Sequence, residues 1–433
     1  MKKLHGGLLV FLVVSLLCAL CGCSADNANT TEDGKKIIRL ATMGLDENVQ
    51  RRVDIYNSQN DEYKIKIDDY SQYSNGDDDN SGETKLTTQI LSGDAPDIID
   101  LAQLPYENYI SKGLLEDLYP YMDNDPDIDI DDMTESIMGA YAVDGKLYQI
   151  IPDYVIVTVI GRSDELGSYP GWSIEEINAY IDGLGADEQS FVYTTKDNIL
   201  YYCSMLALNQ FVSVADNKCD FNNDEFMQLL EFANKYQDEV TLNDDFIPEI
   251  ELIKDGKVKL NLMSFFDLKT FLYYQEMFGS ELVFKGFPTE TKSNGSSVDA
   301  NINLGVSAKS KYKDEVWEFL RTFYLDDYQS STDYLPISET YLSQRLEEAR
   351  HFGDNSIVYG WDEFRIKLPN ATDNDINLIK GLISSINHPM QKDSKIVQII
   401  VDEAKLYFAG QRSSEETAKI IQSRVKIYIN ENT

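Results

Sequence analysis

The stretch SGDAPDIIDL at residues 92–101 decides the fold class of this chain. Gly93 and Pro96 place a turn directly before an apolar run, and that run predicts a buried strand. Side chains that follow such a strand emerge at its carboxyl end, where open α/β sheets bind their ligands. The stretch therefore predicts an α/β fold with a ligand site beside the end of this strand.

Elements of alternating type precede this stretch. Residues 37–42 (IIRLAT) predict a strand, Asp46 can cap the following helix, and residues 63–68 alternate apolar and polar side chains as a half-buried strand does. Residues 86–91 predict a short helix. The order strand, helix, strand, helix, strand predicts right-handed crossovers and a parallel sheet.

Toward the C-terminus the patterns become mostly helical. Asp144 and Gly145 predict a hairpin turn, and Ser413 with Glu416 forms the capping box of the last helix. Further strands are expected at 154–161, 257–264, 282–285 and 302–306.

The composition fits a packed globular protein that binds no nucleic acid. A chain of 433 residues exceeds the size of one core, so more than one folding unit is expected. The formal net charge of −36 repels phosphate backbones, which excludes nucleic acid as a partner.

The N-terminus predicts an export signal. Lys2 and Lys3 precede an apolar run at 8–20 that is too short to span a bilayer comfortably. This is the layout of a secretory signal peptide, here residues 1–22. The sequence offers no later membrane-spanning segment.

A lipid anchor is expected directly after this signal. The run LCGC at 20–23 resembles the lipobox of bacterial lipoproteins, which implies cleavage before Cys23 and attachment of lipid to its thiol. Residues 23–36 are polar and predict a flexible tether. An ordinary signal peptide with incidental cysteines is the alternative. Of the later cysteines, Cys203 and Cys219 form either a disulfide or free, buried thiols.

Signatures of catalytic sites are missing from the sequence. None of the three Gly-Lys pairs is followed by Ser or Thr, so there is no P-loop, and there is no Gly-x-Ser-x-Gly elbow. Past the leader only His351 and His388 occur, too few and too far apart for a His-Glu-x-x-His zinc helix. The acidic runs at 123–134 and 220–231 lack the glycine of a calcium loop. We therefore expect no cofactor, no metal and no chemistry.

Five segments occur in a fixed order along the chain. They are SGDAPDII at 92–99, KGLLEDLYP at 112–120, DGKLY at 144–148 with Ile151-Pro152, GWSIEE at 171–176, and GVSAKSK at 305–311 with WEFL at 317–320. In this order they resemble the extracellular solute-binding proteins of ABC importers, in the maltose-binding-protein-like group. The resemblance extends over nearly the whole mature chain.

The resemblance implies a two-lobed periplasmic-binding-protein-like α/β fold, with mainly parallel sheets flanked by helices and a hinge between the lobes. The first lobe is expected at 37–152 and about 302–350, and the second at 153–301 and about 351–433. Such a protein captures a small solute between its lobes and delivers it to an ABC permease without chemistry. We expect an oligosaccharide as solute. We also expect a monomer held by the Cys23 lipid on the extracellular face of a bacterial, preferentially Gram-positive, membrane.

Strand ends and interlobe loops nominate the ligand-binding residues. Neutral sugars are held by aromatic rings against their C–H faces and by polar side chains at their hydroxyls. The candidates are Met43, Gly44, Tyr70, Tyr73, Gln103, Asp153, Tyr154, Phe265, Phe266, Asn301 and Trp361. For each of them the alternative is that the residue lies at the rim of the cleft or in the core and does not contact the ligand.

Two other functions remain open at this stage. The same fold can present its ligand to a membrane sensor instead of a permease. A surface-anchored glycan hydrolase is the third hypothesis, because counting carboxylates neither locates nor excludes a catalytic pair.

Overall fold

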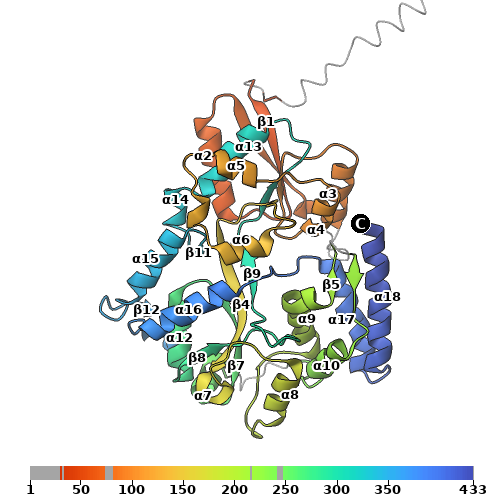
Figure 1. Ribbon diagram of the computed structural model, residues 1–433, viewed down its shortest axis with the longest axis vertical. Coiled ribbons are helices and arrows are strands. Elements are labelled where there is room, and N and C mark those ends of the chain that lie inside the picture. Colours follow the sequence, from red (N-terminus) through yellow and green to blue (C-terminus); the bar gives the residue numbers. More distant parts are fainter. Residues whose placement is uncertain (1–29, 32–33, 74–80, 215–216, 241–246, 433) are drawn as a thin grey trace, which may run out of the picture.

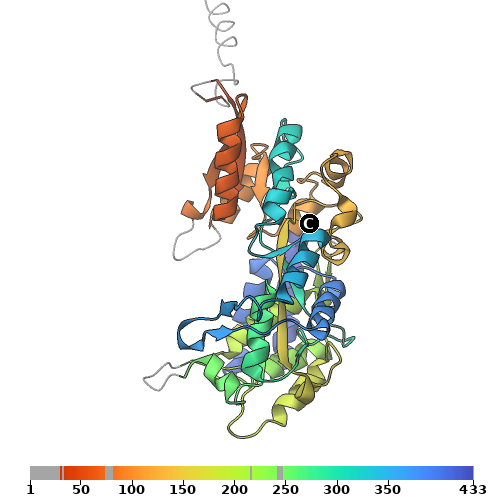
Figure 2. The ribbon, with the colours of Figure 1, turned by 90° about the vertical axis from the view of Figure 1, so that its left-hand side faces the viewer.

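The computed structural model describes the chain except for residues 1–29, 32–33, 74–80, 215–216, 241–246 and 433. The described residues form two lobes, the first at the top of Figure 1 and the second below it. Figure 2, turned by 90°, shows the same division. Cys23, the expected signal peptide and most of the expected tether lie outside the described residues.

The first lobe is built on a four-stranded sheet in the order β10-β3-β1-β2. Strands β1 (Lys36–Thr42), β2 (Tyr63–Asp69) and β3 (Ile98–Asp100) are parallel, and β10 (Leu304–Val306) pairs with β3 in the antiparallel direction. The parallel sheet predicted from the alternating elements is confirmed. Because these three strands are parallel, their carboxyl ends lie at one edge of the sheet.

The helices of the first lobe begin where the sequence indicates. Asp46 caps α2 (Glu47–Gln59), and its side chain accepts the N–H groups of Asn48 and Val49. Val49 and Val53 on this helix are buried against the sheet. The other helices of this lobe are α3 (Ser81–Leu91), α4 (Tyr106–Ser111), α5 (Tyr119–Asn124) and α13 (Lys313–Leu320).

The second lobe is built around one long strand, β4 (Asp153–Arg162). All of its partners run antiparallel to it. They are β7 (Leu260–Phe265), β8 (Leu282–Phe284), β9 (Ser297–Ala300) and β11 (Leu335–Pro336). The expectation of mainly parallel sheets therefore holds in the first lobe and not in the second. The chain enters each of these partner strands from the end of the sheet opposite to that at which β4 begins.

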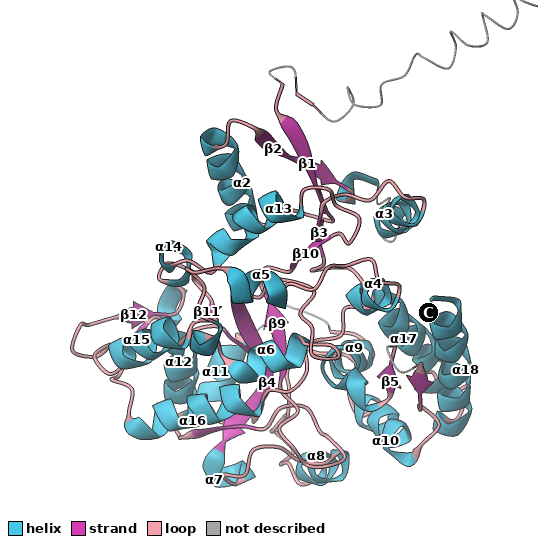
Figure 3. Ribbon diagram, turned by 45° about the horizontal axis from the view of Figure 1, so that its top comes forward, coloured by secondary structure: helices cyan, strands magenta, loops and turns pink. Residues whose placement is uncertain are grey.

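Two groups of helices flank this second sheet, as Figure 3 shows. One group packs around its own apolar core: α8 (Ile174–Asp182), α9 (Lys196–Ala207), α10 (Asp224–Ala233), α17 (Ser394–Phe408) and α18 (Ser414–Asn432). The other group comprises α11 (Glu249–Lys254), α12 (Leu268–Phe278), α15 (Glu339–Ala349) and α16 (Asp373–Ser385).

Short elements complete the described chain. The short helices are α6 (Glu135–Tyr141), α7 (Ser163–Leu166) and α14 (Asp326–Gln329), and the short strands are β5 (Val212–Ser213), β6 (Lys218–Cys219), β12 (Val358–Tyr359) and β13 (Ile366–Lys367). The 3₁₀ turns are η2 (Ser71–Tyr73), η3 (Ile130–Asp132), η4 (Leu208–Gln210), η5 (Arg321–Phe323) and η6 (Asp362–Phe364).

The chain passes between the sheets more than once. It enters the second sheet at β4, returns to the first between β9 and β10, and reaches the second again at β11, which pairs with the start of β4. α15 then packs against α12. Residues 335–349 therefore lie with the second sheet, earlier than the return expected near 350, while the lobe limits as a whole remain a prediction.

Local signals at the turns and caps are confirmed. Asp144 and Gly145 have φ values of 52° and 73°, between the bridged residues Val143 and Lys146. Ser413 Oγ accepts the Glu416 N–H at 3.1 Å at the start of α18. Both described cysteines, Cys203 and Cys219, are free thiols, and Cys203 is buried. Among the described residues, no helix has the length and apolar character needed to cross a bilayer.

Candidate functional site

Charged side chains from the two lobes meet at the carboxyl edge of the first sheet. Asp46, which follows β1, lies close enough to Asp153 at the start of β4 to help raise the pKa of that carboxyl, although burial is the larger cause. We call this surface the interlobe face. Its residues are Gly44, Asp46, Glu83, Gln103 and Glu107 from the first lobe, and Asp153, Phe266, Asp299, Tyr334, Arg345, Lys392 and Asp393 from the second.

Asp153 is a fully buried carboxyl on this face. Its Oδ2 accepts hydrogen bonds from the hydroxyl of Tyr328, at 2.9 Å, and from the hydroxyl of Thr332. The Asn301 side chain also lies close enough to this carboxylate to work against the rise in its pKa. Burial raises the pKa of Asp153 to about 6. These contacts join the start of β4 to the segment after α14.

An aromatic wall stands beside Asp153. The half-buried ring of Tyr334 lies 6.4 Å from that of Phe266, at an interplanar angle of 63°. Arg345 donates hydrogen bonds to the backbone carbonyls of Tyr334 and Thr332 and so fixes the loop that carries the ring. Half-buried rings held in this way can stack against the C–H face of a sugar.

Polar groups fill the centre of the face. Lys392 Nζ lies 2.6 Å from Asp299 Oδ1, and both side chains are largely shielded from solvent. Burial raises the pKa values of Tyr106 and Tyr141, and the Asp299 charge adds to the shift of both, after that of Glu107 in the case of Tyr106. The Lys392 charge also reaches Asp100 at the end of β3, although burial dominates there and raises the pKa of that carboxyl. Side chains from β3, α4, α6 and β9 thus share one electrostatic environment.

Three carboxylates occupy the other side of the face, and we call them the interlobe carboxylate cluster: Glu83 of α3, Glu107 of α4, and Asp393, the N-cap of α17. Burial raises the pKa values of Glu83 and Glu107 to about 7, and the Asp393 charge contributes to both. Figures 1 and 3 show α4 of the first lobe beside the upper end of α17 of the second. The cluster therefore places like charges from the two lobes close together.

Five sequence-predicted residues lie at or next to the interlobe face. A Cβ on Gly44 would stand 3.8 Å from Nε2 of Gln103, so the loops after β1 and β3 are neighbours. The Asn301 N–H donates to the Asp153 carbonyl at 3.2 Å. Phe266 belongs to the aromatic wall, and Met43 is partly buried beside the first-lobe core.

Four predicted residues are buried in the core, with 0–4% of their surface exposed: Tyr70, Asp153, Tyr154 and Phe265. Of these four, only Asp153 is also a residue of the interlobe face. The Tyr70 hydroxyl donates to Gln89 Oε1 at 2.7 Å inside the first lobe. Successive side chains on a strand point to opposite faces, and the sequence does not tell which residue at a strand end turns inward. Although Asp153 is buried, its charge still reaches Tyr334 on the interlobe face, and its hydrogen bonds hold Tyr328 and Thr332.

Tyr73 and Trp361 are exposed but lie apart from these contacts. Lys85 Nζ sits 3.2 Å above the centre of the Tyr73 ring, on η2 and α3 of the first lobe. The Trp361 ring lies 5.4 Å from that of Tyr273, in the loop between β12 and β13. In Figure 1 this hairpin lies at the outer flank of the second lobe.

Sequence reasoning missed most of the charged residues on the face. Glu83, Tyr334, Arg345, Lys392 and Asp393 carried no ligand signal of their own. Asp393 fits an N-cap position, which predicts a helix and not a site. A weak signal was available for Glu107, which stands in the first turn of the helix that follows β3.

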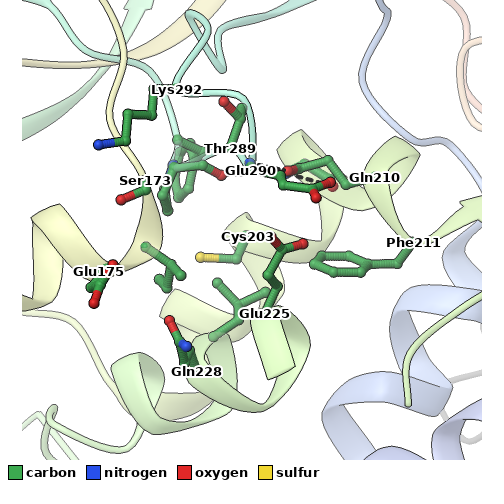
Figure 4. Close-up of a pocket in the computed structure, with 15 residues that line it drawn as sticks. Ser173, Glu175, Cys203, Gln210, Phe211, Glu225, Gln228, Thr289, Glu290 and Lys292 are labelled. Atoms are coloured by element: carbon green, nitrogen blue, oxygen red, sulfur yellow. Dashed lines mark hydrogen bonds between the residues drawn. The ribbon is translucent and has the colours of Figure 1, made fainter. Parts of the chain in front are cut away.

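A separate pocket of about 240 Å³ lies inside the second lobe. It is lined by residues of α8, α9 and α10 and of the loop at 287–292. Figure 4 shows Cys203 near its middle, Phe211 to the right and Glu175 to the left. Its lining contains no residue of the interlobe face, so it is distinct from the candidate site.

Comparison with solved structures gives the fold. The chain is similar to the sugar-binding protein MalE from Xanthomonas citri, with 15% identity and a TM-score of 0.58 over 92% of this chain and 98% of that one. The chain has the two-lobed fold of periplasmic binding proteins. An oligogalacturonide-binding protein from Yersinia enterocolitica matches over 92% and 99%, with 15% identity and a TM-score of 0.56. An ABC substrate-binding protein from Listeria monocytogenes, in complex with cycloalternan, matches over 92% and 98%, with 20% identity and a TM-score of 0.54. No protein-family profile matches the sequence.

Proposed function

We propose that this protein is an extracellular solute-binding protein that captures an oligosaccharide between its lobes and delivers it to an ABC permease. The observation that carries the proposal is the extent of the fold match: 92% of this chain aligns with 98% of a sugar-binding protein. Of two further proteins with this fold, one is in complex with cycloalternan and the other is an oligogalacturonide-binding protein.

The chemistry of the interlobe face supports the same function. Tyr334 and Phe266 offer ring faces, while Gln103 and the carboxylates offer groups that bond sugar hydroxyls. Among the sequence candidates we retain Met43, Gly44, Gln103, Phe266 and Asn301 as ligand contacts. Capture and release need no bond to be made or broken, so no residue is assigned a catalytic role.

Export and anchoring form a separate part of the proposal. Residues 1–22 act as a signal peptide, Cys23 carries the lipid, and 23–36 form the tether, on the extracellular face of a Gram-positive membrane. The support is the layout of the sequence, with Lys2 and Lys3 before an apolar run and Gly22 before Cys23.

The experiment is a thermal-shift screen of the mature protein against neutral oligosaccharides, followed by small-angle scattering with each hit. A ligand that binds only the folded state raises the melting temperature, and closure of the lobes reduces the radius of gyration. A monomer that compacts with at least one oligosaccharide is the expected result. New reducing ends in the same incubation, or dimensions unchanged by every stabilising ligand, would contradict the proposal.

A further inference from the structure

The pocket inside the second lobe has an apolar interior. Phe211, Leu229 and Phe287 contribute to its wall and are buried, with 3–7% of their surface exposed. Cys203 of α9 is a free thiol in the same wall and lies near the middle of the pocket in Figure 4. Burial raises the pKa of this thiol, so it stays neutral and behaves as a small apolar group. An interior of this kind favours an aromatic or aliphatic ring over a sugar.

The volume of the pocket fits one small ring system. It measures about 240 Å³. A cavity of about 150 Å³ with apolar walls holds one benzene molecule, so the additional space admits a second, fused ring. Larger ligands of drug size occupy pockets of about 300–1,000 Å³. A bicyclic aromatic ring therefore fits this pocket, whereas an oligosaccharide does not.

The mouth of the pocket is acidic. Glu175 and Glu290 in its lining are exposed, and Glu225 is half-buried. Within the described residues, none of these three carboxylates has a hydrogen bond or an ion pair of its own. Lys292 also lines the mouth, but its Nζ is already paired with Glu176 Oε1 at 2.7 Å. Charge at the mouth therefore favours a cationic substituent on the ring and disfavours a carboxylate.

Hydrogen bonds hold the loop that forms one wall of the pocket. Gln210 Nε2 donates to the Pro288 carbonyl at 3.3 Å, and Gln210 Oε1 accepts the Glu290 N–H at 3.1 Å. The Thr289 N–H donates to the Trp172 carbonyl at 2.9 Å. The loop is thus fixed both to the end of α9 and to the segment before α8. A wall that is already ordered costs little conformational entropy when a ligand binds.

We propose that this pocket binds a bicyclic aromatic amine, with the fused ring in the apolar interior and the ammonium group at the acidic mouth. The inference goes beyond the proposed function, because it adds a second ligand site at another place in the fold. All lining residues fall between 173 and 292, within the second lobe. Binding here therefore needs no closure of the two lobes.

The test compares three probes that share the indole ring, by isothermal titration calorimetry on the full mature chain at pH 7. They are indole, tryptamine and indole-3-propionate, which carry no charge, an ammonium and a carboxylate. We expect tryptamine to bind at least about tenfold tighter than indole-3-propionate, with indole in between. Small-angle scattering should show the same radius of gyration with and without tryptamine.

Variants separate the ring site from the charge at its mouth. Ala207→Leu fills the interior from α9, where Ala207 is buried, and should weaken all three probes at least about tenfold. Ile174→Trp plugs the pocket from a half-buried position on α8 and should do the same without altering the core. The double variant Glu225→Gln, Glu290→Gln should bring tryptamine and indole-3-propionate to within about threefold and leave indole unchanged.

The control is Glu276→Gln, which changes an exposed carboxylate on α12 outside the pocket and should alter no affinity. Melting temperatures within a few degrees of wild type establish that each variant is folded. Equal affinity for tryptamine and indole-3-propionate, or no titration signal with any probe, would overturn the inference. So would tryptamine binding that survives both plugging variants, or compaction with tryptamine, which would locate the ring between the lobes. The proposed function would stand in each of these cases, because oligosaccharides test it separately.

Discussion

The Tyr328 hydroxyl donates a 2.9 Å hydrogen bond to Oδ2 of Asp153. The two residues belong to segments that are far apart in the sequence, α14 and the first position of β4, and both side chains are buried. Tyr328 also lies under the guanidinium of Arg52 from α2, 4.9 Å from its ring centre. This one tyrosine therefore connects a helix of the first lobe to the central strand of the second.

Tyr328→Phe should destabilise the protein by about 1–3 kcal/mol, because it leaves a buried carboxylate with one donor fewer. Urea unfolding at pH 7 measures the effect. Tyr341→Phe on α15 is the control, since the Tyr341 side chain is more exposed, and its effect should stay within about 0.5 kcal/mol. Equal losses in the two variants would show that the bond to Asp153 adds no stability.

Glu107→Gln should stabilise the protein at pH 8 and change little at pH 5. The folded pKa of Glu107 is about 7, above the unfolded value of about 4.3, so its contribution to stability is complete below the unfolded value and is lost as the pH rises through 7. We expect a gain of about 1–2 kcal/mol at pH 8, measured by urea unfolding at both values. A variant that loses stability equally at pH 5 and pH 8 would refute the raised pKa.

Arg321→Met should cost about 2–3 kcal/mol, because Asp125 would lose its cation in a nearly buried position. Arg321 Nη2 donates to Asp125 Oδ1 at 2.7 Å, Trp317 Nε1 donates to Oδ2 at 3.0 Å, and the Asp125 side chain is 5% exposed. The ion pair lowers the pKa of Asp125, so the loss should shrink as the pH falls below about 4.

The control for this variant is Lys405→Met, which removes an ion pair with Asp402 in which both side chains are about half exposed. Exposed pairs contribute about 0–1 kcal/mol. Thermal or urea unfolding that ranks the two variants in the opposite order would contradict the role assigned to Arg321.

Cys23→Ala should move the protein from the membrane fraction to the medium. The lipobox-like run at 20–23 motivates this prediction, because only the cysteine thiol can receive the lipid. Fractionation and a mass measurement of the mature chain test it. Membrane retention of a correctly cleaved alanine variant would exclude lipid attachment at this position.

Much of the fold was predictable because its signals are local. Asp46 caps α2 through its own side chain, and Asp144 with Gly145 adopts the positive φ values that the hairpin requires. The parallel first sheet follows from alternating strands and helices. Strand direction in the second sheet was not predictable in the same way, because β4 pairs with strands that lie far along the chain, the first of them at 260–265.

The candidate site was predictable only in part. Strand ends pointed to Gly44 and Gln103, and the structure places the two loops that carry them side by side. They also pointed to Phe265, whose side chain turns into the core, because direction at a strand end depends on where the strand begins pairing. Glu107 and Asp393 come near each other only because α4 lies beside the end of α17 in the folded chain, which no local pattern in the sequence records.

β1 enters the first sheet at Lys36 and ends at Thr42, next to the interlobe face. Its seven residues span roughly 23 Å at about 3.3 Å each. The tether proposed above would therefore join the first lobe at the end of β1 that is remote from the interlobe face. In that arrangement, closure of the two lobes would move the second lobe relative to the anchored first lobe.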